Sequence, residues 1–104
     1  MKVTFSAIAK ADLLDIAIYI AADNPTRALT FVDELESKCV KLGNAPGIGT
    51  ARPELGEGIR VMPHENYVVF YCEKRQIIRI ERVLHGARDI RANDFESTER
   101  PFGE

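Results

Sequence analysis

A cluster of charged side chains late in the sequence is the first candidate for chemistry. The segment RVLHGARDI, residues 82–90, places Arg82, His85, Arg88 and Asp89 within eight positions. A histidine exchanges protons near neutral pH, and arginines bind phosphate or carboxylate groups through forked hydrogen bonds. The segment therefore suggests three alternatives: a catalytic site facing a phosphodiester, a docking surface, or a structural corner that ties down the end of a strand.

Cleavage of RNA would need a base for the ribose 2′-hydroxyl, an acid for the leaving oxygen and cations for the charge on phosphorus. The sequence offers Glu54 as the base, Arg60 and Arg82 as cations, and His85 as the proton shuttle. Strand alternation, however, places Arg79 on the face opposite Arg82, and a regular strand would place His85 on the Arg79 side. Because the charged side chains are divided between two faces, fewer of them can act together at one catalytic site. We therefore predict that His85 is a hydrogen-bonded corner residue.

The arginines are concentrated in the second half of a chain that is slightly acidic overall. The net charge is −2, and the residues after Gly43 carry eight arginines but a single lysine, Lys74. Arginine suits forked contacts with anions, so this half either meets an anionic partner or, because acidic residues are interspersed, forms a solvated sheet face. Little of this charge is available to neutralise the phosphates of ribosomal RNA.

Length and composition predict one globular domain. The chain has 104 residues, of which 45% are hydrophobic and 29% charged, enough for a single modest core. No secretory signal and no membrane-spanning run is recognisable, so we expect a cytoplasmic protein. Cys39, Cys72 and His64 have no metal-ligand spacing, and we expect buried thiols, no metal and no cofactor. Residues 1–95 are predicted to form the domain, and residues 96–104 a polar C-terminal tail whose order the sequence leaves open.

The first half of the chain predicts one strand and two helices. A strand over residues 2–6 is followed by a helix that ends near Ala22, with Ser6 as its N-cap. Asn24 caps a second helix, which ends at Gly43. Because the connection between the helices is short, they are predicted to form an antiparallel hairpin.

Three strand-like runs follow a long loop rich in glycine and proline, residues 44–57. The runs are GIRVMP, NYVVFYCEK and QIIRIERVL, and they are joined by short turns. The order of elements is β-α-α-β-β-β. It predicts an α+β fold in which the helical hairpin packs on one face of a small antiparallel sheet.

The middle run of the three is apolar on both faces. Its residues divide into Tyr67, Val69 and Tyr71 on one face, and Val68, Phe70 and Cys72 on the other. A sheet covered by helices on one side should alternate apolar with polar residues. Either the chain covers the second face itself, or a partner does. The first strand and the tail look too short to cover it, so we predict a partner surface.

Four segments together resemble the RelE/ParE superfamily of bacterial toxins from toxin–antitoxin pairs. They are YIAADNP with the following A..FVDEL, then RPELGEGIRV, NYVVFY and IRIERVLHGARDI, in this order across residues 3–95. The segments RPELG…GIR and RVLHGARDI are similar to the ParE branch rather than to RelE itself.

The resemblance implies a compact toxin that poisons DNA gyrase without a cofactor or covalent chemistry of its own. It also implies a cognate ParD-like antitoxin, with a ribbon-helix-helix part that binds DNA and a C-terminal tail that wraps the toxin. The toxin would then meet DNA only through its antitoxin, and no membrane. RelE relatives instead cut mRNA on the ribosome, and this activity is the alternative.

The candidate contacts with an antitoxin or a target are the arginines of the second half and the aromatic strand face. They are Arg52, Glu54, Arg60, Tyr67, Val69, Tyr71, Arg79, Arg82 and Arg88. For Arg52 and Glu54, which flank Pro53 in the long loop, the alternative is a turn that positions the next strand. No catalytic residue is assigned unless the protein is a nuclease.

Overall fold

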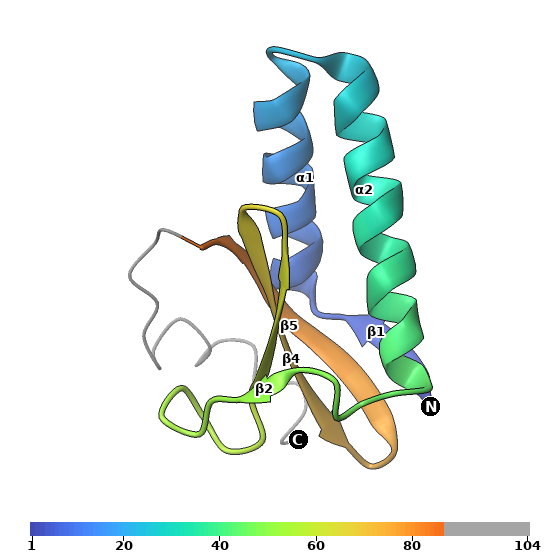
Figure 1. Ribbon diagram of the computed structural model, residues 1–104, viewed down its shortest axis with the longest axis vertical. Coiled ribbons are helices and arrows are strands. Elements are labelled where there is room, and N and C mark those ends of the chain that lie inside the picture. Colours follow the sequence, from blue (N-terminus) through green and yellow to red (C-terminus); the bar gives the residue numbers. More distant parts are fainter. Residues whose placement is uncertain (87–104) are drawn as a thin grey trace.

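The computed structural model describes residues 1–86 (Figure 1). The elements are β1 (Lys2–Phe5), α1 (Ala7–Ala21), α2 (Pro25–Val40), the short 3₁₀ helix η1 (Lys41–Gly43), β2 (Thr50–Ala51), β3 (Arg60–His64), β4 (Tyr67–Lys74) and β5 (Ile77–His85). The predicted α+β architecture is confirmed: two antiparallel helices form a hairpin that packs on a sheet. No helix within residues 1–86 is long and apolar enough to cross a membrane. Arg88, Asp89 and the tail over 96–104 lie outside the described residues.

Within residues 1–86 the sheet is mixed and has five strands, in the order β1-β5-β4-β3-β2. The predicted purely antiparallel sheet needs correction, because β1 runs parallel to β5, from the pair Lys2–Ile77 to the pair Phe5–Ile80. The helical hairpin after β1 supplies the long connection that a parallel neighbour requires. The extra strand β2 lies in the loop predicted to be irregular, where two residues pair with β3.

Both helices begin at the predicted caps. Ser6 Oγ accepts a hydrogen bond from the Ala9 amide at 2.9 Å and donates to the carbonyl of Glu81 at 2.8 Å, which ties the helix start to β5. Asn24 Oδ1 accepts from the Arg27 amide at 3.0 Å. Each cap satisfies one of the amides that the first helical turn leaves unpaired.

Tight turns join the last three strands. Arg75 and Gln76, between β4 and β5, have φ values of 54° and 62°, and Glu65, between β3 and β4, has φ of 54°. Left-handed residues in two-residue turns match the twist of the strands they connect. The turns therefore hold β3, β4 and β5 in fixed register.

The main core lies between the helical hairpin and the sheet. Its most buried members are Ala9, Ile16, Phe31, Leu35, Cys39, Leu42, Met62, Val69, Tyr71, Ile78, Ile80 and Val83. Val69 is 0% exposed and Tyr71 is 1% exposed. In this conformation the two side chains, which the sequence suggested as partner contacts, are covered by the helical hairpin.

The second sheet face is also buried, which corrects the prediction that it forms a partner surface. Phe70 and Cys72 are 1% and 4% exposed. Leu55 and Ile59, from the loop between β2 and β3, join them in a second apolar cluster together with Leu84. The prediction failed because the cover includes two isolated apolar residues of a glycine- and proline-rich loop.

An irregularity in β5 changes which side chains share a face. Tyr71 pairs with Ile80 and Phe70 with Arg82, so Glu81 is left between the two pairs. One extra residue in a strand moves the following side chains to the opposite face.

Candidate functional site

Arg82 near the end of β5 is held by Asp12 of α1. Its Nε and Nη2 donate to the two Asp12 carboxylate oxygens at 2.8 Å and 3.0 Å. The Val83 amide, just past the irregularity, also donates to Asp12 Oδ2 at 3.0 Å. The two charged side chains are 15% and 12% exposed. Arg82, predicted to dock a partner, is thus engaged in a two-pronged internal ion pair that joins α1 to β5.

His85 lies on the helix side of the sheet, not on the Arg79 side that a regular strand would give. It pairs with Tyr67 of β4, and the two rings meet edge to face with centroids 5.3 Å apart. Tyr67 is half-buried and packs in turn on Phe31 of α2. The His85 side chain therefore continues an aromatic row at the end of the strand, which fits a corner residue.

Arg79 lies on the opposite face and is nearly buried. It is 9% exposed, and its Nε lies 3.3 Å from Oε1 of Glu81, which is 1% exposed. Glu81 also contacts the Cys72 thiol at 3.8 Å, and burial raises the pKa of that thiol to about 12. Arg79, another predicted contact, is therefore part of the interior of the second face.

Arg60 and Tyr71 jointly hold the loop before β2. The Tyr71 hydroxyl donates to the Pro46 carbonyl and accepts from the Gly49 amide, both at 2.8 Å. Arg60 Nη1 donates to the Gly49 carbonyl at 2.6 Å. A Cβ at Gly49 would lie 2.6 Å from that hydroxyl, so the loop can approach Tyr71 this closely only with glycine.

Arg52 and Glu54 are the predicted contacts that remain well exposed among residues 1–86. Their side chains are 42% and 58% exposed and form an ion pair in the loop between β2 and β3. The hydrogen bond from Arg52 lowers the pKa of Glu54 below its usual value. A carboxylate whose pKa is lowered is a weaker proton acceptor, while its charge still suits a polar contact.

The four residues proposed for RNA cleavage do not converge within the described chain. Arg60 is level with Ile80 of β5, because both pair with Tyr71. His85 pairs with Tyr67, four residues from Tyr71 along β4, which is about 13 Å at the usual rise of a strand. Glu54 is paired with Arg52 in the loop, and Arg82 is held by Asp12.

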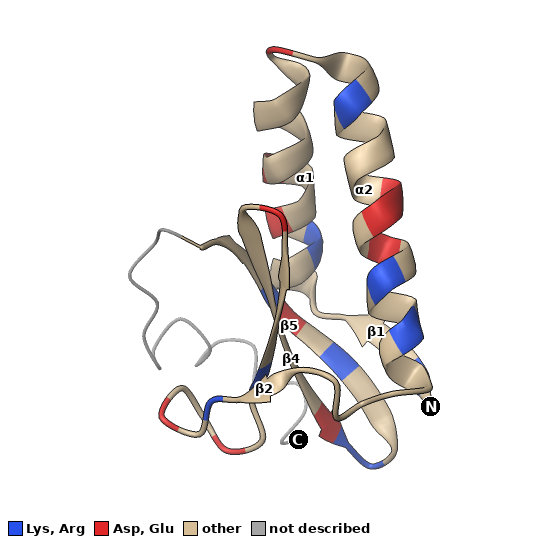
Figure 2. Cartoon of the chain, viewed as in Figure 1, with Lys and Arg blue, Asp and Glu red and all other residues tan. Residues whose placement is uncertain are grey.

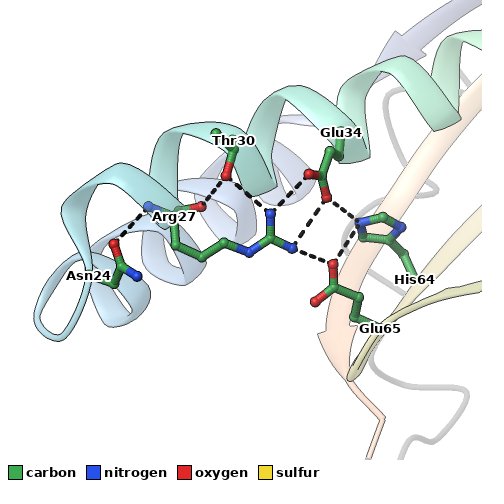
Figure 3. A network of polar contacts seen from close by, with 6 residues as sticks. All are labelled: Asn24, Arg27, Thr30, Glu34, His64 and Glu65. Atoms are coloured by element: carbon green, nitrogen blue, oxygen red, sulfur yellow. Dashed lines mark hydrogen bonds and ion pairs between the residues drawn. The ribbon is translucent and has the colours of Figure 1, made fainter.

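A polar cluster that the sequence did not suggest joins α2 to the turn between β3 and β4 (Figure 3). Arg27 donates to Glu34 at 2.9 Å and also to Glu65. His64 Nε2 lies 3.8 Å and 3.9 Å from oxygens of the same two carboxylates. The seven-residue spacing of Arg27 and Glu34 puts both on one face of α2, but only the fold brings His64 and Glu65 to them.

The histidine and the two glutamates have the proximity of a metal site, with ligand atoms within 4.8 Å of one another. The Arg27 guanidinium, however, already supplies the positive charge, and its hydrogen bond lowers the pKa of Glu34. The arrangement therefore acts as an ionic clasp between helix and turn. A metal ion would have to displace Arg27.

A concave apolar surface lies beside the C-terminal end of α2. This groove has a volume of about 590 Å³, and its apolar lining is Leu42, Ile48 and Met62. Ile48 is 69% exposed. The charged residues of the groove lining are Asp33, Glu34, Lys38 and Lys41. Figure 2 shows blocks of both charges along α2. Such a groove can accept an apolar peptide, and the two lysines of its lining can bind acidic groups on that peptide.

Comparisons with known proteins agree with this fold. The family described as ParE toxin of type II toxin-antitoxin system, parDE, matches residues 3–90. A solved structure of the chromosomal ParDE system from P. aeruginosa aligns with a TM-score of 0.72 and 24% identity, over 82% of this chain and 95% of that one. At this identity the structural likeness shows the fold alone. No functionally curated protein matches by sequence. With the family match spanning most of its length, the chain belongs to the ParE toxin family of type II toxin–antitoxin systems.

Proposed function

We propose that the protein inhibits DNA gyrase in the cytoplasm and is neutralised by tight binding of a cognate ParD-like antitoxin. The match to the ParE family over residues 3–90 carries this proposal. The scattered positions of Glu54, Arg60, Arg82 and His85 support inhibition by binding rather than RNA cleavage, because general acid–base catalysis requires these groups within hydrogen-bond reach of one phosphate.

The test of the target is a supercoiling assay with purified gyrase and DNA. The protein is expected to abolish supercoiling or to raise the amount of cleaved DNA complexes. Arg52→Ala, which removes an exposed arginine of the β2–β3 loop, should weaken this effect. Arg75→Ala, at the exposed β4–β5 turn, is the matched control and should not. Growth arrest on induction with unchanged supercoiling at excess protein would rule out gyrase, and cut mRNA in a translation reaction would indicate the RelE activity instead.

The antitoxin is proposed to place its C-terminal tail in the groove beside α2. An extended or helical tail could bury apolar side chains against Ile48 and Met62 and place acidic groups near Lys41. The antitoxin should be encoded by a short neighbouring reading frame with a ribbon-helix-helix start.

Calorimetry with that antitoxin tests the site. Ile48→Asp puts a charge on the apolar floor and should weaken binding at least tenfold, about the cost of one lost anchor in an interface. Leu29→Asp, at an equally exposed apolar position of α2, should leave binding unchanged. Equal antitoxin affinity of the two variants would exclude the groove as the antitoxin site. The proposal that gyrase is the target would stand unchanged.

A further inference from the structure

The outer face of α1 is apolar and exposed. Leu14 and Ile18 are each 61% exposed. Along the same side lie Ala7 and Ala11, also exposed, and the half-buried Ala21. A helix that is apolar on all sides is normally buried on all sides. Figure 2 shows the contrast with α2, which carries blocks of both charges while α1 carries few.

These five positions have the spacing of a coiled-coil seam. They follow one another at intervals of four, three, four and three residues. In heptad terms Ala7, Leu14 and Ala21 are d positions, and Ala11 and Ile18 are a positions. A β-branched residue at a with leucine at d favours two parallel strands. The small residues at the other positions allow two helices to approach closely.

The charges that flank the seam complement a second copy of the same helix. Lys10 precedes the seam residue Ala11 at a g position, and Asp15 follows Leu14 at an e position. In a parallel pair, a g residue meets the e residue five positions later on the other helix. Lys10 would therefore meet the partner subunit's Asp15, and Asp15 the partner subunit's Lys10. Neither side chain forms an ion pair with another residue in the described part of the chain.

We propose that two copies of the protein associate through α1 as a parallel, two-fold symmetric helix pair. The same patch serves both subunits, as a two-fold axis requires. The seam is short, but α1 is already folded against the sheet, so pairing carries no cost of helix nucleation. This interface is separate from the groove beside α2 and does not depend on the antitoxin or on gyrase.

Sedimentation equilibrium of the full chain without antitoxin tests the proposal. The unmodified protein should show a concentration-dependent rise from monomer to dimer mass, and Ile18→Glu should remain a monomer throughout. Leu29→Glu, which adds the same charge at an exposed position outside the seam, should dimerise like the unmodified protein. Circular dichroism and unfolding midpoints establish that both variants are folded. A monomeric unmodified protein, or an Ile18→Glu dimer of unchanged strength, would overturn the proposal.

A charge exchange tests the parallel orientation. Lys10→Glu and Asp15→Lys should each weaken the homodimer about tenfold, since two exposed pairs change from attraction to repulsion. Mixing the two variants should restore association as a heterodimer, because both contacts across the seam are then attractive. Absence of this rescue would exclude the parallel pair. If Ile18→Glu instead leaves the mass unchanged and weakens antitoxin binding, the face belongs to the antitoxin.

Discussion

The second face of the sheet and the outer face of α1 are both rich in apolar residues, yet the fold treats them in opposite ways. On the sheet, Phe70 is 1% exposed and is packed in a cluster that includes Leu55 and Ile59 of the β2–β3 loop. On α1, Leu14 and Ile18 stay 61% exposed. The difference teaches that an apolar pattern indicates that a surface will be buried, but not by which segment. The sheet face was predicted to await a partner and is closed, whereas the helix face is open.

The sharpest way to break this comparison is to remove one large side chain from each face. Phe70→Ala should lower the free energy of unfolding by about 3–5 kcal/mol, because it leaves a cavity in a closed cluster. Leu14→Ala on the open face should change it by less than about 1 kcal/mol. Urea unfolding of both variants at a dilution that keeps the protein monomeric measures the two values. A loss below about 1 kcal/mol for Phe70→Ala would mean that the sheet face is open in solution.

A second comparison sets the inner side of α1 against its outer side. Asp12→Ala should destabilise the protein by about 3 kcal/mol. The substitution removes the carboxylate that pairs with the largely buried Arg82 and that accepts a hydrogen bond from the Val83 amide. Asp12→Asn keeps an acceptor for the amide and should cost less. Asp15→Ala on the outer side is the matched control, with a change within about 0.5 kcal/mol. Similar values for Asp12→Ala and Asp15→Ala would contradict the internal role of the Arg82 ion pair.

The two cysteines report on the two sides of the sheet separately. Burial raises the pKa of both Cys39, in the helix-side core, and Cys72, in the second cluster, to about 12. The folded state therefore holds far less of the reactive thiolate than a free cysteine does. Labelling with a thiol reagent should therefore require local opening. With Cys39→Ala and Cys72→Ala proteins, we expect Cys72 to react faster, because its cover includes a loop. Faster labelling of Cys39 would mean that the helix-side core opens more readily than the second cluster, contrary to this expectation.

The smallest expected effect concerns the ionic clasp of Arg27. The pKa of Glu34 is lowered in the folded protein, chiefly by the hydrogen bond from Arg27. The unfolded state therefore binds more protons than the folded state in mild acid, and the stabilisation is present above the unfolded pKa and lost as the pH falls through the folded one. Arg27→Gln should flatten the acid side of a plot of stability against pH, measured by urea unfolding. The effect should be slight because these groups are exposed. An acid side that becomes steeper in the variant would contradict the assignment.

Local features of the fold could be predicted because neighbouring residues decide them. Ser6 and Asn24 cap the helices as expected, and the turns that precede β4 and β5 lie where the sequence places them. Three other features could not be predicted, because each depends on contacts between distant segments. They are the parallel pairing of β1, the extra residue Glu81 in β5 and the packing of Leu55 on the second sheet face.

The same limit applies to the candidate site. The sequence identified Arg82 as a residue with a specific contact, but its partner, Asp12, lies 70 residues away. The charge of Arg79 suggested an exposed side chain, whereas Arg79 is nearly buried and forms an ion pair with the buried Glu81. In the polar cluster, the seven-residue spacing places Arg27 and Glu34 on one face of α2, but no local pattern predicts the approach of His64 and Glu65. Residue types thus indicate chemistry, while the fold decides whether that chemistry faces a partner or the interior.

The parallel pairing of β1 with β5 also sets an order of events during folding. The helical hairpin and the β3-β4-β5 meander can each form from contacts between neighbours in the chain, which close fast. The sheet neighbour of β1 is β5, and the Ser6 hydroxyl is hydrogen-bonded to the Glu81 carbonyl, 75 residues away in the sequence. On a translating ribosome, β1 therefore has to wait until β5 has been synthesised. The two halves of the molecule dock only in that final step, and until then the apolar faces between them stay open to chaperones and to aggregation.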